Sequence, residues 1–175
     1  MDNGRNLLVV VLGAVVAFVL QIVVAPYIPI MSAMPNFVAV YAMLLAVARP
    51  QIPSYVAAFV LGLLFDLISG APVGALAFSL TLCCAIAASV FNVLNNDTLF
   101  VGFLALAVGL VLAELCYGVF MLALGYNAGI AEALVFRALP CAVYDIVFAF
   151  VLYPLMLRLF APSGPTAPPI ASQLR

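Results

Sequence analysis

The stretch LLFDLISGAPVG, Leu63–Gly74, places one aspartate in an apolar run and follows it with turn-forming residues. The apolar residues around Asp66 predict the end of a membrane helix, and Gly70, Pro72 and Gly74 predict a tight turn into the next helix. An ionisable side chain costs about 2.5–3.5 kcal/mol at the centre of a membrane helix. The stretch therefore predicts a helix–turn–helix corner in which the aspartate has a specific partner.

The rest of the chain shares this apolar character. It has 175 residues, of which 69% are hydrophobic, and its mean hydropathy is +1.39. Soluble domains are roughly half apolar, so the composition indicates an all-α integral membrane protein. We expect one transmembrane helical domain over 1–160 and a Pro-rich disordered cytoplasmic tail over 161–175. The net charge of −1 provides no basic surface for nucleic acid.

The apolar runs predict a bundle of about six transmembrane helices, because each crossing needs roughly 20 apolar residues. The second helix is short or re-entrant, because Phe37–Ala48 rises only about 18 Å. It spans only if it begins near Met31, with Pro35 bending its first turn. In the last helix, Pro140 and Pro154 predict kinks. The predicted helices are Leu7–Val24, Phe37–Ala48, Ser54–Ser69, Pro72–Leu94, Leu99–Leu124 and Ala133–Phe160.

The arginines determine the expected orientation. With six spans, the two termini and the second loop share one side of the membrane, and Arg5, Arg49, Arg158 and Arg175 all lie there. The loops on the other side carry no lysine or arginine. The positive-inside rule therefore predicts that both termini are cytoplasmic. If the second segment does not span, the N-terminus moves outside and only Arg5 is misplaced.

Four ionisable residues fall inside the predicted helices. The helical rise from each helix start places Asp66, Glu114 and Arg137 in one layer near the outer face, and Asp145 deeper. We hypothesise that Arg137 pairs with Glu114 or Asp66. The pair would be a structural ion pair that sets helix packing, or part of a proton or ion site. A third interpretation has these side chains snorkel to the headgroups. The role of Asp145 stays open.

Asp66 has two interpretations of its own. Its carboxylate lies close enough to the turn to bind loop N–H groups or the positive start of the next helix, where Pro72 would sit in the first turn. This makes it a structural clamp for the turn. Gly70 and Gly74 are four residues apart, so they also permit close helix approach. The alternative is that the stretch contacts a partner.

The residue inventory argues against catalysis. The chain has no histidine, which is the usual general base and a common metal ligand. All four cysteines fall inside apolar runs, where they behave as small apolar residues. We therefore expect neither an enzyme nor a cofactor or metal site. The cysteines are Cys83, Cys84, Cys116 and Cys141.

The pattern from Gly62 through Asp66 and Gly70 to Pro72 and Gly74 resembles the signature of MreD, the bacterial rod shape-determining membrane protein family. The resemblance covers about residues 31–160. Asn36 stands where the family often has aspartate, so this chain lacks a charge there. Further similar features are Pro35-Asn-Phe before an apolar helix that ends in Ala-Arg49-Pro50, Arg137 near the start of the final helix, and Tyr153-Pro154-Leu near its end.

This resemblance implies a non-enzymatic scaffold of the cell-elongation machinery, located in the bacterial cytoplasmic (inner) membrane. The implied main partner is MreC, and the intramembrane helix faces would bind its single transmembrane helix. The wider complex would include the MreB filament, RodA and the transpeptidase partner of RodA, so that the filament is linked to peptidoglycan synthesis. Membrane lipids would surround the helices.

Two other function classes fit parts of the sequence. The substrate-binding membrane subunit of a vitamin-type transporter has a similar size and six helices, and a cluster of Asp66, Glu114 and Arg137 would suit a polar ligand. Such a subunit would hold a small molecule tightly. A membrane enzyme acting on lipids needs a histidine, a paired acidic motif or a metal set near a loop, and the sequence contains none of these.

Overall fold

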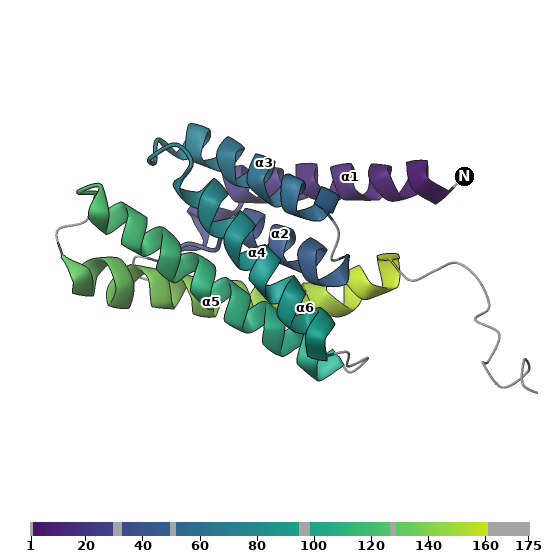
Figure 1. Ribbon diagram of the computed structural model, residues 1–175. Helices are drawn as coiled ribbons and strands as arrows, with labels where there is room; N and C mark the ends of the chain where they lie inside the picture. Colours follow the sequence, from purple (N-terminus) through teal and green to yellow (C-terminus); the bar gives the residue numbers. More distant parts are fainter. Residues whose placement is uncertain (1, 30–32, 50–51, 95–98, 127–128, 161–175) are drawn as a thin grey trace, which may run out of the picture.

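The computed structural model describes residues 2–29, 33–49, 52–94, 99–126 and 129–160, and its elements there are all helical. Figure 1 shows the helices as an elongated bundle with α2 in its interior. The predicted tail over 161–175 and the proposed helix start at Met31 lie outside the described residues. The elements are α1 (Asp2–Val23), the 3-10 turn η1 (Ala25–Tyr27), α2 (Phe37–Ala48), α3 (Ile52–Ser69), α4 (Ala75–Leu94), α5 (Leu99–Ala123), the π-helix η2 (Ala131–Ala138) and α6 (Leu139–Phe160).

Helix α2 forms the centre of the bundle. It packs against α1, α3, α4, α5 and α6, and all eleven residues from Phe37 to Val47 are buried. A helix that is enclosed on every side must be apolar on every side, which explains the unbroken apolar run. Its 12 residues rise about 18 Å, well short of the roughly 30 Å hydrocarbon core.

The predicted bounds of this second helix are confirmed at both ends. The alternative start before Pro35 is wrong for the described residues 33–36, which are not helical. Asn36 precedes the first helical residue with φ −106° and ψ 79°, and its side chain accepts a hydrogen bond from the N–H of Ala39. This is the geometry of an N-cap, which begins a helix at the next residue.

The fourth helix begins at Ala75 and not at the predicted Pro72. Gly74 has φ +95°, a left-handed backbone conformation that cannot belong to a right-handed helix. The N–H of Ala75 donates to the carbonyl of Pro72 over 3.1 Å, which closes the turn. Pro72 therefore belongs to the turn, and the predicted helix start was wrong by three residues.

The last helix is interrupted near its start by η2, whose eight residues form a π-helix. The N–H of Leu139 donates to the carbonyl of Leu134, five residues back. Pro140 follows immediately and Pro154 lies inside α6. A π-turn changes the helical register before the proline, which lacks an N–H for the normal ladder. The prolines of this helix predict kinks, but no sequence pattern here predicts the π-helix.

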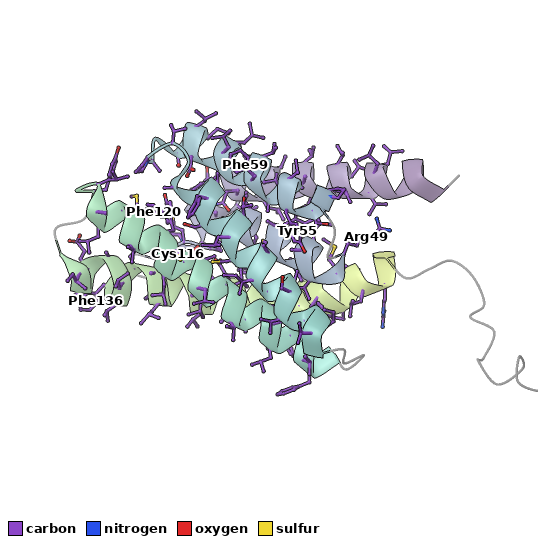
Figure 2. The ribbon with its side chains drawn as sticks, viewed as in Figure 1. Arg49, Tyr55, Phe59, Cys116, Phe120 and Phe136 are labelled. Atoms are coloured by element: carbon purple, nitrogen blue, oxygen red, sulfur yellow. The ribbon has the colours of Figure 1, made fainter. Side chains whose placement is uncertain are left out.

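The outer surface of the bundle is strongly apolar. Large apolar side chains point away from the bundle along its outline in Figure 2. Phe59 and Phe136 are 45% and 67% exposed. Soluble proteins rarely expose so continuous an apolar surface, whereas lipid would cover it. Within the part of the chain that the structure describes, three helical segments are long and apolar enough to cross a membrane, and three further apolar helices are shorter. The three long segments are Leu7–Tyr27, Phe100–Ala123 and Ala131–Arg158.

Candidate functional site

Asp66 holds the corner between α3 and α4. Its side chain is fully buried, and Oδ2 accepts hydrogen bonds from the N–H groups of Gly74 and Leu76 at 3.0 Å and of Ala77 at 3.3 Å. The first N–H groups of a helix have no intrahelical partner. Gly74 has no side chain that caps them, so a carboxylate from α3 performs that task at the positive end of α4.

The glycines of the same motif have two different roles. Gly70 and Gly74 have φ values of +67° and +95°, and no atom lies within 4 Å of the place where a Cβ would stand. The prediction that these two permit close helix approach is therefore wrong, because they serve the conformation of the turn. Gly62 provides the close approach instead, since a Cβ there would lie 2.5 Å from Cα of Ala77.

A second polar cluster surrounds the start of α2, and Asn36 is its centre. The backbone N–H of Asn36 donates to Oδ1 of Asp145 over 2.7 Å. Its side-chain Nδ2 donates to Oε1 of Glu114 over 3.3 Å, while its Oδ1 caps the N–H of Ala39 at 3.0 Å. The Asn36 residue thus joins the central helix to both α5 and α6.

Gln21 in α1 also bonds the backbone at the start of α2. Its Oε1 accepts a 2.7 Å hydrogen bond from the N–H of Phe37, and its Nε2 donates to the carbonyl of Pro35 over 3.2 Å. Gln21 was not among the residues predicted to matter. Its signal was available, because an amide inside a long apolar run needs a hydrogen-bond partner. The capping role of Asn36 also had a signal, since asparagine directly before an apolar helix is a preferred N-cap.

Asp145 is fully buried, and only one of its two carboxylate oxygens has a partner among the described residues. Oδ1 accepts the N–H of Asn36, whereas Oδ2 has no hydrogen bond. A buried carboxylate with an unsatisfied oxygen is destabilising.

A cavity of about 300 Å³ opens beside this cluster. Glu114 from α5 and Arg137 from η2 both line it, as do Asn36 and Gln21. Glu114 is 6% exposed, and Arg137 is exposed at the surface of the molecule. Figure 2 shows that Phe136, the neighbour of Arg137, lies at the end of the bundle opposite Arg49. The cavity lining also includes Tyr117, Tyr126, Cys141, Ser69 at the end of α3 and the turn residues Gly70 and Ala71.

The three residues predicted to pair are distributed differently from the prediction. Asp66 is bound to the start of α4 and does not line the cavity. Glu114 and Arg137 face the same cavity, and the arginine charge is near enough to act on the carboxylate. Within the described residues, however, no ion pair of 4.0 Å or less joins Arg137 to either acid. In place of the predicted direct contact, Glu114 Oε1 accepts a hydrogen bond from Asn36, and Asp66 accepts hydrogen bonds from backbone N–H groups.

Cys141 lines the cavity, and the other three cysteines do not. Cys83, Cys84 and Cys141 are buried and Cys116 is partly buried, which fits their expected behaviour as small apolar residues. Figure 2 shows Cys116 among the side chains of α5. Among the described residues, no group of three or more metal-ligating side chains comes together.

A family model described as rod shape-determining protein MreD matches residues 4–162, which is nearly the whole chain. No curated protein and no solved structure matches the chain.

Proposed function

Because the chain belongs to the MreD family of rod shape-determining proteins, we propose that it is a non-enzymatic membrane scaffold of the cell-elongation machinery. The observation that carries the proposal is the family match over residues 4–162. This family is a shape-determining structural family and not a known enzyme family. MreC is the main proposed partner, with MreB, RodA and the transpeptidase partner of RodA in the wider complex.

We place the protein in the bacterial cytoplasmic membrane as a multi-pass protein with both termini in the cytoplasm. The apolar exterior and the three long apolar segments support a membrane position. The start of α1, the start of α3 and the end of α6 lie at the same end of the bundle in Figure 1. The arginines at positions 49 and 158 belong to this end, which the positive-inside rule assigns to the cytoplasm.

A scaffold in the membrane must present fixed helix faces, and the two polar clusters supply that rigidity. Asp66 fixes the angle between α3 and α4 through hydrogen bonds to Gly74, Leu76 and Ala77. Asn36 and its acidic partners fix the central helix against α5 and α6. We propose that the outward faces so positioned bind the transmembrane helix of MreC.

Depletion of the protein in its native bacterium tests the proposed role. Rod-shaped cells should become round, whereas unchanged cell shape would contradict the scaffold. Site-specific crosslinking tests the partner in a variant whose four native cysteines are replaced. Single cysteines are introduced at exposed positions on four helices, with a matched cysteine at Leu44, which is fully enclosed. At least one exposed position should crosslink to MreC and Leu44→Cys should not. The exposed positions are Val11, Phe59, Val108 and Phe150.

The polar cavity favours one second candidate, the substrate-binding subunit of a vitamin-type transporter. Such a protein should retain a vitamin through purification, and growth of the bacterium should depend on that vitamin when synthesis is blocked. A cell-shape phenotype without vitamin dependence would exclude this candidate.

A further inference from the structure

The cavity beside the start of α2 presents charges of both signs whose pairing is incomplete. Glu114 lies in the wall of the cavity, and its exposed fraction is only 6%. Its one hydrogen bond among the described residues comes from the neutral amide of Asn36 and is long, at 3.3 Å. Arg137 lines the same cavity and is exposed, and its charge acts on Glu114, but among the described residues no ion pair of 4.0 Å or less joins Arg137 to Glu114 or Asp66. Both charges are therefore available to a ligand.

The charges restrict what the ligand can be. A buried carboxylate is stabilised by strong donors, and an ammonium group supplies three of them. An isolated cation in the cavity would be repelled by Arg137, and an isolated anion would be repelled by Glu114. A molecule that carries an ammonium group and an anionic group pairs with both residues at once. The carboxylate is the deeper of the two, so the ammonium group would enter first.

The size and lining of the cavity fit such a group. Its volume is about 300 Å³, at the lower end of the roughly 300–1,000 Å³ range of ligand pockets. The wall is mixed, because apolar side chains such as Phe65 and Met121 stand beside the polar ones. This mixture suits a ligand that is charged at one end and less polar near the point where it leaves the cavity.

We propose that this cavity binds a small zwitterionic group, with a primary ammonium against Glu114 and a phosphate or carboxylate against Arg137. The same chemistry has two sources, the headgroup of an ethanolamine phospholipid and a free soluble zwitterion. The proposal rests on the cavity and its charges, and it is independent of the scaffold role.

The experiment uses the full chain, purified in detergent and freed of native lipid. The probes are phosphatidylethanolamine, phosphatidylcholine, phosphatidylglycerol and soluble phosphoethanolamine, and binding is measured by thermal shift and by native mass spectrometry. Phosphatidylethanolamine should bind and raise the melting temperature. Phosphatidylcholine should bind about tenfold more weakly, because its ammonium has no N–H donors. Phosphatidylglycerol should also bind weakly, because it has no cation for Glu114.

Two variants that each remove one charge test the named residues, and Glu114→Gln does so without a change of shape. Glu114→Gln and Arg137→Gln should each weaken phosphatidylethanolamine binding by about tenfold or more. The matched controls are Glu132→Gln and Arg158→Gln, whose side chains do not line the cavity. These controls should change binding by no more than about twofold, because exposed charges contribute little. Should Glu114→Gln fail to fold, the charge reversal Arg137→Glu on the exposed residue replaces it and should abolish binding.

The outcomes are distinct. Equal binding of the three phospholipids, or unchanged binding by both Glu114→Gln and Arg137→Gln, would overturn the proposal. A full response to soluble phosphoethanolamine would assign the site to a free zwitterion, and a response to the phospholipid alone would assign it to a headgroup. Failure to crosslink with MreC would instead count against the scaffold role and leave these binding results unaffected.

Discussion

The backbone N–H of Asn36 donates a 2.7 Å hydrogen bond to Oδ1 of Asp145, although 109 residues separate them in the chain. The bond joins the N-cap residue of α2, the helix enclosed in the bundle, to α6, the last helix of the chain. Glu114 contacts the side chain of the same asparagine from α5. Three segments that are distant in sequence are therefore held at one point.

Two substitutions of Asp145 should distinguish how much its hydrogen bond stabilises the fold from how much its buried charge destabilises it. Asp145→Ala leaves the N–H of Asn36 buried without an acceptor, which should lower the free energy of unfolding by about 1–3 kcal/mol. Asp145→Asn keeps the acceptor and removes the charge of a carboxylate whose Oδ2 has no partner, so it should be at least as stable as the wild type. Thermal unfolding in detergent measures both. Equal stability of the two variants would show that the bond contributes nothing.

Loss of Asp66 should weaken the α3–α4 corner. Asp66→Ala leaves three N–H groups at the start of α4 without their acceptor, and we expect a loss of about 2–4 kcal/mol in unfolding free energy. Asp66→Asn should lose less, because one amide oxygen remains. The control is Leu67→Ala, at an adjacent position that is 59% exposed. Rod shape supported by Asp66→Ala at normal protein levels would contradict the importance given to this residue.

The family that the sequence resembles often has aspartate where this chain has Asn36, and Asn36→Asp introduces that residue. The substitution replaces the amide that donates to Glu114 at 3.3 Å by a second carboxylate. Like charges at this distance should lower the unfolding free energy by about 1–3 kcal/mol. In the double variant Asn36→Asp/Glu114→Gln, the amide at position 114 can donate to the carboxylate at position 36. This variant should therefore recover most of the lost unfolding free energy. A double variant as unstable as the sum of the two single variants would show that the residues are not coupled.

Gly62→Ala tests the close approach of α3 and α4. The added Cβ would lie 2.5 Å from Cα of Ala77, a backbone atom that cannot rotate away. The helices must separate, and overpacking of this kind costs about 1–3 kcal/mol. Gly129→Ala is the matched control, because no atom lies within 4 Å of the place where its Cβ would stand and its φ lies outside the left-handed region. The measurement is again the melting temperature of the purified protein, and an equal effect of the two substitutions would contradict the close approach.

Most of the helical architecture could be predicted from the sequence, because apolar runs and prolines mark where membrane helices begin and end. The second helix illustrates both the strength and the limit of such reasoning. Its bounds, Phe37–Ala48, follow from the apolar run and from Arg49. The sequence does not predict that protein buries this helix on every side, because a helix that lipid covers has the same kind of apolar run.

The polar clusters were predictable only where partners are close in sequence. Asp66 lies 8 to 11 residues from the N–H groups that it binds, so the turn itself suggested the contact. The bond between Asn36 and Asp145 depends on how the helices pack, and no local pattern encodes it. The π-helix that carries Arg137 could not be predicted either, because no distinct sequence signal marks its register.

The enclosure of α2 also has a consequence for how the protein is made. The helix emerges from the ribosome early, yet Glu114 and Asp145, the acids that bind its first turn, are synthesised roughly 70 or more residues later. Its 12 residues are too few to be inserted as an independent span of about 20 residues. We therefore expect this helix to reach its final place late, after α5 and α6 have entered the membrane, and truncation before Asp145 should leave it sensitive to added protease.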